Sequence, residues 1–355
     1  MLYQLKNKIK RNDLLYWSPN KAFSYNVNFN FIFNVRSTGK TTQCVCLCVD
    51  NFINTGEEFC YIRRYKSETK QNQKLLNKFL DNVKLLGDGQ KGGEWHVLTK
   101  RKENEKEISE YRRVGFLMSL SVQSNYKSSN LYDNVTNIIY DEAIIKRGGK
   151  SNHYLYDEVQ ELLHLISSIV RNRTNYKVWI LGNNLDLLNP FYEFFRIPKF
   201  NKFYVDKERG IYIEESDMTK LMLEEKEKTP LYKLTKDTEF NAENILNKPS
   251  DTLNINISTK SVNDKLLIRL VVNKTTLNVY SRNEGVIYIE RVLKTYNDDY
   301  ILLVMTNDKP CYRELKEFKK TYLCQALLMR LYRNELLFSD EYSYNVFELV
   351  ANYIK

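Results

Sequence analysis

The chain has 355 residues, of which 43% are hydrophobic and 28% charged, and its formal net charge is +10. This composition is ordinary for a globular protein and excludes a disordered chain, and the length allows two domains with separate cores. No run of about 18 apolar residues occurs, and the start, MLYQLKNKIKRND, has no apolar core, so we expect no membrane span and no secretion. The basic excess suits a protein that meets polyanions, although solubilising surface charge produces the same excess.

Six cysteines, at positions 44, 46, 48, 60, 311 and 324, raise the question of a metal site. In a helix, Cys44 and Cys48 share a face while Cys46 points away, and no histidine lies nearby in the sequence to complete a tetrahedral site. We therefore expect these residues to pack a helix against a sheet as small apolar side chains. Free thiols without a secretion signal indicate a reducing compartment.

The segment FIFNVRSTGKTTQ, residues 31–43, ends like a phosphate-binding loop of the Walker A type, G-x-x-x-x-G-K-[ST]. An apolar stretch at 27–33 predicts a buried strand before it, and a helix is predicted at 41–54, with Gly56 as its C-cap. A loop in this context presents backbone N–H groups and a helix N-terminus to phosphate. The predicted ATP-binding residues are Asn34, Arg36, Ser37, Thr38, Gly39, Lys40, Thr41 and Thr42.

Asn34 stands where the motif has its first glycine. Asparagine tolerates a positive φ better than other non-glycine residues, so we expect the loop to accept this substitution. Lys40 would bridge the β- and γ-phosphates, and the Thr41 hydroxyl would join the Mg²⁺ coordination shell. The cofactors predicted from this loop are therefore ATP and Mg²⁺.

The segment after this helix continues to alternate strands with helices. A strand is predicted at 58–65 and a helix at 74–86, followed by a hairpin of WHVLT and VGFLMSLS around the charged tip KRKENEKE. Strands that alternate with helices favour an α/β fold with a mostly parallel sheet.

The strand VTNIIYDEA, predicted at 135–143, ends in Asp141 and Glu142. This is typical of a Walker B motif with an adjacent catalytic glutamate, in which Asp141 holds Mg²⁺ and Glu142 polarises the attacking water. A solvated strand end would explain an isolated acidic pair, but the phosphate loop upstream favours the catalytic interpretation. Separate Walker A and Walker B strands with this glutamate predict an ATPase of the ASCE class.

A helix is predicted at 157–170, and a further strand, YKVWILGNN at 176–184, ends in Asn183. A polar side chain at that strand end can sense the γ-phosphate and hold the lytic water, although Gly-Asn-Asn is also good turn chemistry. We favour a catalytic role for Asn183. The chain lacks the guanine-selecting motif [NT]-K-x-D, so ATP is the better substrate than GTP.

The pattern changes after about residue 200, so we expect an ATPase domain at 1–200, a linker or lid at 201–250, and a smaller α+β domain at 251–355. The last is predicted to hold three or four antiparallel strands, one long helix at 312–334 and a final helix. Nuclease chemistry needs clustered carboxylates for two metal ions. The available acids are Glu290, Asp298, Asp299 and Asp340, but the first strand carries none, so a binding or docking module is expected.

Taken in order, six motifs resemble one family, the genome-packaging ATPases (encapsidation proteins) of small short-tailed bacteriophages. The motifs are NVRSTGKT, FCYIRRYKSE, SVQSNYKSSN, NIIYDE, SSIVRNR and LGNNLDLLNPFYEFF. The resemblance covers residues 20–200, and the C-terminal third matches only by architecture, as that family's vestigial RNase H-like nuclease domain. The clearest departure from the family pattern is Asn34, which stands in place of the first glycine of the phosphate loop.

The resemblance implies a homomeric ring, usually a pentamer, that uses ATP to package double-stranded DNA into a preformed procapsid. The implied partners are the DNA, other copies of the chain, the portal or connector of the procapsid, and a packaging RNA as a further candidate. The implied location is the host cytoplasm, with transient residence at the portal vertex.

Three basic residues take roles from the resemblance alone. Arg171 matches the family's arginine finger, and Arg173 is the second candidate for that role. Lys127 matches a basic residue that acts across the subunit interface, and Arg36 matches a regulatory loop arginine. For Arg171 and Lys127 the alternatives are a surface arginine at a helix end and a loop lysine.

Translocation must ignore base sequence, so contacts from Lys and Arg to phosphates should dominate. Arg63, Arg64 and Lys66 follow a predicted strand end and are candidate DNA contacts, with a solvated basic loop or an intersubunit salt bridge as the alternative. Two other functions stay open: another DNA-dependent ATPase, such as a HerA/FtsK-like pump or a helicase, and a nucleotide-switched assembly scaffold.

Overall fold

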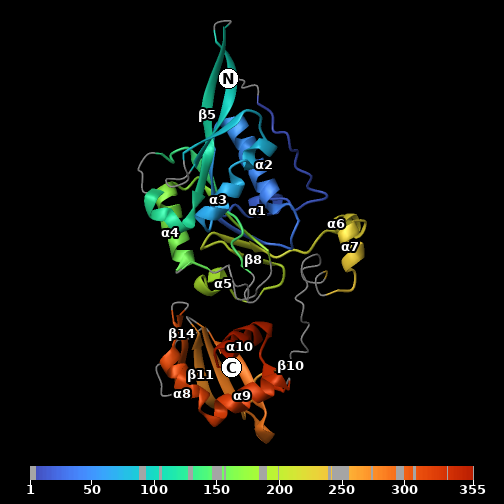
Figure 1. Ribbon diagram of the computed structural model, residues 1–355, viewed down its shortest axis with the longest axis vertical. Coiled ribbons are helices and arrows are strands. Elements are labelled where there is room, and N and C mark those ends of the chain that lie inside the picture. The colour runs from blue at the N-terminus through green and yellow to red at the C-terminus, as the bar shows by residue number, and fades with distance from the viewer. Residues whose placement is uncertain are drawn as a thin grey trace. The chain divides into compact units, whose positions relative to one another are not determined.

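The computed structural model divides the chain into two compact units, Met1–Leu185 with Phe200–Lys248, and Asp186–Lys199 with Pro249–Lys355 (Figure 1). The residues that the structure describes are 5–87, 93–103, 106–126, 131–145, 154–155, 157–183, 190–198, 200–238, 241, 256–272, 275–292, 300–306, 309–333 and 335–354. Each unit is built around its own sheet.

The first unit holds a nine-stranded sheet in the order β3-β4-β5-β2-β6-β7-β1-β9-β8. Its strands are β1 (Phe29–Phe33), β2 (Glu58–Arg63), β3 (Val83–Leu86), β4 (Gly93–Glu103), β5 (Lys106–Ser119), β6 (Val135–Tyr140), β7 (Lys177–Gly182), β8 (Phe203–Asp206) and β9 (Ile211–Glu214). Its helices are α1 (Asn20–Tyr25), α2 (Lys40–Thr55), α3 (Lys66–Asn72), α4 (Glu158–Val170), α6 (Lys220–Glu227) and α7 (Pro230–Thr235), with short 3₁₀ helices η1 (Leu75–Lys78) and η2 (Leu120–Tyr126).

The six central strands, from β5 to β9, run parallel, and the antiparallel pairs lie at the two edges. Strands β1, β2, β6 and β7 are almost wholly buried, as expected for a parallel sheet that is covered on both faces. The predicted α/β class with a mostly parallel sheet is therefore confirmed. Strand β7 lies between β1 and β6, so the ends of all three meet at one edge of the sheet.

Helix α2 follows the phosphate loop and lies in the core of this unit. Cys44, Cys46 and Cys48 are all buried, because α2 is covered on two sides. One side of α2 packs against the hydrophobic core of the first unit. On another side of the helix, Asn7 Nδ2 donates to the Cys46 carbonyl at 3.1 Å. The cysteines therefore act as packing residues, as the sequence indicated.

Two local predictions differ from the structure in this unit. The helix predicted at 74–86 is replaced by η1 and by β3, because Asn82 adopts a left-handed conformation (φ 52°) and Val83–Leu86 pair with β4. The hairpin strands β4 and β5 are longer than predicted and extend into the charged tip, so the hairpin projects from the rest of its unit (Figure 1).

The segment 201–250, expected to be a linker or lid, contributes two strands to the sheet. Strand β9 pairs with β1 in parallel, and β8 pairs with β9 in an antiparallel hairpin. Helices α6 and α7 follow, and the Thr219 and Thr229 hydroxyls cap their N-termini.

The second unit holds a seven-stranded mixed sheet in the order β10-β16-β13-β12-β11-β14-β15. Its strands are β10 (Asn256–Ile257), β11 (Lys265–Val272), β12 (Thr275–Ser281), β13 (Ile287–Val292), β14 (Ile301–Thr306), β15 (Lys309–Pro310) and β16 (Leu336–Phe338). Its helices are α5 (Pro190–Phe194), α8 (Tyr312–Lys319), α9 (Tyr322–Tyr332) and α10 (Glu341–Ile354), with the 3₁₀ turn η4 (Asn283–Gly285).

The predicted antiparallel strands are present as β11, β12 and β13, but β14 pairs with β11 and β16 with β13 in parallel. The single helix predicted at 312–334 is two helices, because Thr321 caps the N-terminus of α9 by accepting from the Cys324 N–H. Asp298 and Asp299 lie outside the described residues. Across both units, none of the helices in the described ranges is long and apolar enough to cross a membrane.

Candidate functional site

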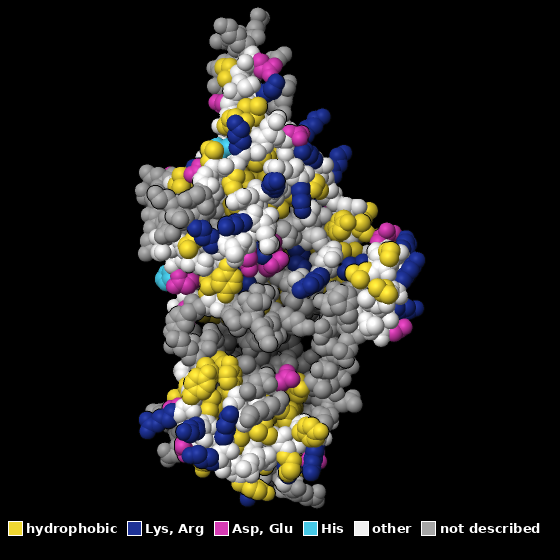
Figure 2. Space-filling model, in the orientation of Figure 1, with side chains coloured by type: hydrophobic (Ala, Val, Ile, Leu, Met, Phe, Trp, Pro, Cys, Tyr) yellow, Lys and Arg dark blue, Asp and Glu magenta, His cyan; other side chains and the backbone are white. Residues whose placement is uncertain are grey.

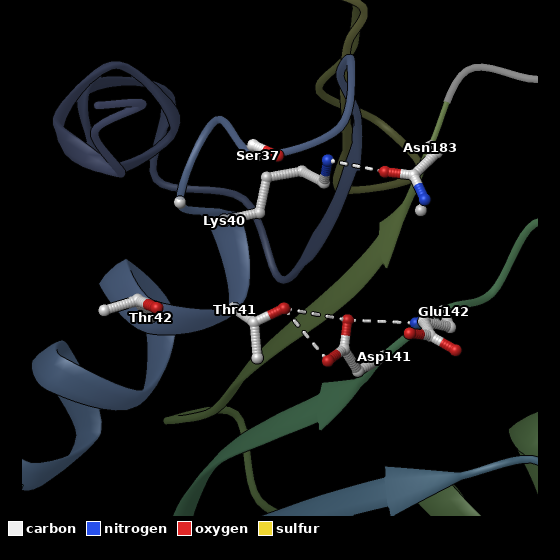
Figure 3. A pocket seen from close by; sticks show the side chains of 9 residues that line it. Ser37, Lys40, Thr41, Thr42, Asp141, Glu142 and Asn183 are labelled. Carbon is white, nitrogen blue, oxygen red and sulfur yellow. Dashed lines mark hydrogen bonds between the residues drawn. The ribbon is translucent and has the colours of Figure 1, made fainter. Parts of the chain in front are cut away.

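A cavity of about 240 Å³ lies at the sheet edge where β1, β6 and β7 end (Figure 3). Its lining residues come from the phosphate loop with the first turn of α2, from the end of β6, and from the end of β7. They are Ser37, Gly39, Lys40, Thr41, Thr42, Asp141, Glu142, Gly182 and Asn183. The structure thus brings the three predicted motifs together at one cavity.

The phosphate loop ends at Gly39, which has a left-handed φ of 81° and is the N-cap of α2. A Cβ here would lie about 3.0 Å from the ring of Tyr16, a tight contact that adds to the backbone preference for glycine. The first N–H groups of α2 have no partners within the helix and, with the helix dipole, favour an anion at this point. Helix α2, which is 16 residues long, begins at this anion site.

Lys40 is folded back onto its own loop. Its Nζ donates to the carbonyls of Asn34 at 2.9 Å and Val35 at 3.0 Å. It also donates to Asn183 Oδ1 at 3.2 Å, the bond drawn in Figure 3. Burial lowers the pKa of Lys40 to about 8, although the carboxylate of Asp141 opposes this shift. A buried cation whose partners are mainly neutral carbonyls is well suited to accept an anionic phosphate.

Asp141 and Thr41 form the centre of the site. The Thr41 hydroxyl donates to Asp141 Oδ2 at 2.9 Å, and the Tyr61 hydroxyl donates to the same oxygen at 2.6 Å. A hydroxyl and a carboxylate are the hard oxygen donors that Mg²⁺ prefers, and Mg²⁺ usually keeps several waters besides one or two carboxylates. The donor set present at this cavity therefore fits a magnesium ion.

Glu142 lies beside this pair with 62% of its side chain exposed, and Arg63 forms an ion pair with it. Its backbone is held in the left-handed region, at φ 57°, which is strained for a residue with a Cβ. The Glu142 N–H donates to Asp141 Oδ1 at 2.9 Å. The strained turn points the two carboxylates of the motif to one cavity (Figure 3).

The predicted DNA contacts Arg63 and Arg64 are not exposed. Arg63 is buried and lies 3.7 Å from Asp141 Oδ2 and 3.3 Å from Glu68 Oε2, besides its pair with Glu142. Arg64 is also buried and pairs with Glu158. The Arg63 guanidinium is held by carboxylates, and that of Arg64 by one carboxylate and two backbone carbonyls, so neither is exposed to a DNA backbone in this structure. Lys66 is half-buried at the start of α3, and its contact with DNA stays a prediction.

The predicted basic residues lie at different places. Arg171 is exposed at the far end of α4, and its guanidinium has no hydrogen bond or ion pair within the described ranges. Arg173 is structural, because its guanidinium donates to five backbone carbonyls, those of Tyr132, Asp133, Val135, Ile169 and Val170. Arg36 is exposed at the tip of the loop. Lys127 lies outside the described residues.

The model of the family described as podovirus DNA encapsidation protein (Gp16) matches residues 11–352. This chain belongs to that family. The DNA packaging protein of Bacillus phage phi29 is 27% identical over 339 residues, which cover 94% of this chain and 96% of that protein. That of Bacillus phage B103 is 26% identical over 323 residues, covering 90% and 94%.

Two solved structures share the fold of this encapsidation-family member along nearly its whole length. The bacteriophage Phi-29 viral genome packaging motor assembly has a TM-score of 0.63 at 23% identity, covering 96% of this chain and 100% of that one. The Phi-28 gp11 DNA packaging motor has a TM-score of 0.56 at 17% identity, covering 96% and 97%.

Asn34, the departure from the glycine of the loop motif, has a negative φ, whereas Ser37 (φ 65°) and Gly39 carry the left-handed turns. Positive φ is therefore not why asparagine is accepted here. Instead its Oδ1 accepts the Ser216 N–H at 2.8 Å, and the Ser216 carbonyl accepts the Val35 N–H at 3.3 Å. The side chain ties the head of the phosphate loop to the segment that follows β9.

Replacing Asn34 by the usual glycine is expected to destabilise this family member. Asn34→Gly leaves the Ser216 N–H without its acceptor and adds conformational entropy to the unfolded chain, so we expect a loss of about 1–2 kcal/mol in the free energy of unfolding. Urea denaturation measures it, with Ser216→Ala as the control that keeps the donating N–H. A glycine variant as stable as the parent would contradict this account.

Sequence reasoning missed Tyr61 and the position of Arg63. Both lie on β2, which pairs with β6 so that Ile62 is opposite Tyr140. Alternate residues of a strand share a face, so Tyr61 and Arg63 point to the same side of the sheet. Polar residues at alternate positions of the strand next to the Walker B strand were the available signal.

Proposed function

We propose that this protein is an ATPase that drives double-stranded DNA through a homomeric ring into a preformed procapsid. The observation that carries the proposal is the contact between the Thr41 hydroxyl and the Asp141 carboxylate, at 2.9 Å, in a cavity that Lys40 and Glu142 also line. This is the donor set that phosphoryl transfer from a magnesium nucleotide requires. Membership of the encapsidation family supports DNA packaging as the work that hydrolysis drives.

In the proposed reaction, the N–H groups of the loop and of the first turn of α2 hold the phosphates. Lys40 would exchange its carbonyl partners for phosphate oxygens, and Thr41 and Asp141 are the residues that would hold Mg²⁺. A bound Mg²⁺ would neutralise charge that develops on the β- and γ-phosphates. Glu142 would leave Arg63 and accept a proton from the attacking water, which Asn183 orients. The water oxygen bonds to the γ-phosphorus as the bond from that phosphorus to the bridging oxygen breaks, and ADP leaves.

The position of Arg171 supports a role in trans. Helix α4 has 13 residues, so Arg171 lies about 20 Å along the helix axis from Glu158. The Glu158 carboxylate pairs with Arg64, whose guanidinium also donates to the carbonyl of Glu142 in the site. An exposed arginine at that distance is poorly placed for its own site but available to a neighbouring subunit. We therefore propose Arg171 as the finger that a neighbour receives, and Lys127 as a second cation across the interface.

The finer partners follow from the family and remain proposals. We propose that the ring is a pentamer and that its partners are the portal or connector of the procapsid and a packaging RNA. We propose the host cytoplasm as its location, with transient residence at the portal vertex. The phi29 and Phi-28 structures that share this fold are described as packaging motors, which supports assembly into a motor.

The second unit is proposed to be a vestigial RNase H-like domain. Within the described residues, no group of three or more His, Cys, Asp or Glu side chains is arranged to hold a metal ion.

The contact with DNA should be electrostatic and independent of sequence. Among the coloured residues of each unit in Figure 2, Lys and Arg side chains are distributed among acidic and apolar ones. Binding that depends on many separate phosphate contacts releases counterions, so its affinity falls steeply as salt rises.

ATP turnover is expected to rise when double-stranded DNA of any sequence is added. DNA affinity should fall on the order of 10³-fold between about 50 and about 200 mM salt if about six phosphates are neutralised. Phosphate release and DNA binding, measured across a salt series on duplexes of different sequence, test both points. A flat salt response would contradict phosphate tracking, strand separation would indicate a helicase, and binding without sustained turnover would indicate a nucleotide-switched scaffold.

A further inference from the structure

Arg64 follows directly after β2 and, with 4% exposure, is among the most buried charged residues in the described part of the chain. Its Nε donates to Glu158 Oε2 at 2.7 Å and its Nη2 to Glu158 Oε1 at 3.0 Å, which is a bidentate pair. The same guanidinium also donates from Nη1 to the Glu142 carbonyl at 3.1 Å and from Nη2 to the Ala143 carbonyl at 2.8 Å. One side chain therefore holds two successive peptide groups of the Walker B turn.

The turn that Arg64 holds is the strained one. Glu142 has a φ of 57°, a conformation that costs a residue with a Cβ roughly 1–2 kcal/mol. Such a conformation persists only where the surroundings fix it. The backbone N–H of Glu142 donates to the Asp141 side chain, and that of Ala143 donates to the Leu181 carbonyl at 2.7 Å. The carbonyls of the same two residues both accept from Arg64.

Glu158 keeps Arg64 in place. Besides the guanidinium, its carboxylate accepts from the Tyr140 hydroxyl at 2.7 Å and from the Leu155 N–H at 2.9 Å. These donors fix the carboxylate at the start of α4, between the end of β6 and the guanidinium. If Arg64 left this pair to bind a DNA phosphate, the buried Glu158 carboxylate would lose its compensating charge, which is strongly unfavourable.

We infer that Arg64, anchored by Glu158, is a positioning residue that fixes the main chain of Glu142 so that its carboxylate faces the cavity. This role differs from that of Arg63, which pairs with the Glu142 side chain. The inference rests on the proposed function, since it assumes that Glu142 activates water. It replaces DNA contact as the role of Arg64.

Arg64→Lys tests the inference. Lysine keeps a charge for Glu158 but has a point-like ammonium group that cannot bridge a carboxylate and two carbonyls at once. We expect kcat for ATP hydrolysis without DNA to fall on the order of 10- to 100-fold, with KM for ATP, DNA affinity and its salt dependence unchanged. Lys70→Gln, an exposed charge loss at the end of α3, is the matched control and should leave all four quantities unchanged.

A purely structural role would lower the unfolding temperature and weaken nucleotide binding together, so both are measured beside the kinetics, using a fluorescent ATP analogue. If Arg64→Lys does not fold, the pair Arg64→Gln with Glu158→Gln removes both charges together and should show the same loss of kcat. Glu158→Gln alone should reproduce most of that loss, and the two single effects should not add.

Parental kcat in a folded Arg64→Lys protein would overturn the inference. A loss of DNA affinity with unchanged DNA-independent turnover would overturn it in favour of a phosphate contact. Absence of ATP turnover in the wild-type protein would count against the proposed function itself, so the two failures are distinguishable.

Discussion

Glu142→Gln is expected to reduce steady-state ATP turnover by roughly 10²- to 10⁴-fold while leaving nucleotide binding intact. Glutamine keeps the size and the hydrogen-bonding reach of the side chain but cannot accept a proton from water. The groups that hold the phosphates, Lys40 and the first turn of α2, are unchanged by this substitution. Phosphate release and titration with a fluorescent ATP analogue measure the two quantities separately.

Lys40→Ala is the comparison that separates binding from chemistry. It removes the buried cation that donates to Asn34, Val35 and Asn183, so both nucleotide binding and turnover should be lost. If Glu142→Gln hydrolysed ATP at the parental rate, Glu142 would not be the base. The exposed carboxylate of Glu142 would then serve only to hold Arg63.

Arg171→Ala is expected to lower turnover of the assembled ring on the order of 10³- to 10⁵-fold, the usual contribution of an arginine finger. The loss should arise between subunits, because Arg171 is exposed and lies at the end of α4 that is remote from Glu158. A mixture of Arg171→Ala with Glu142→Gln subunits should therefore regain part of the activity. The first variant supplies an intact Glu142, and the second supplies the missing arginine.

Arg173→Ala is the control for this experiment, since it lies two residues away and donates to five backbone carbonyls. Its loss should appear as a lower unfolding temperature, and mixing should not correct the stability of the altered subunits. Native mass measurement establishes that mixed rings have formed. If such rings never regain hydrolysis, the trans assignment of Arg171 is wrong.

The chemistry of the site was predictable because each motif is local. The phosphate loop, its strand and its helix lie within about thirty residues, and their apolar periodicity and Gly39 depend on near neighbours only. The same holds for the Walker B strand and for the strand that ends near Asn183. Parallel strands present their carboxyl ends at one edge, so these motifs could be expected to meet.

Periodicity failed where two structures fit the same residues. Apolar residues at 74–86 suit a helix, yet Val83–Leu86 became an edge strand because β4 offers them backbone partners. The segment 312–334 reads as one amphipathic helix, yet Thr321 interrupts it by capping the start of α9. In both cases a hydrogen-bonding partner, and not the apolar pattern, decided the outcome.

Residues alone determined the class of protein, the nucleotide loop, the acidic pair and the polar end of the third strand, because these depend on short segments of chain. The order of the strands was decided only in the folded protein, where β2 lies against β6 and buries Arg63 and Arg64 beside the acidic pair. The same is true of Asn34, whose partner Ser216 is 182 positions away. A charge is free or paired according to which strand lies next to it, and that neighbour is set by long-range packing.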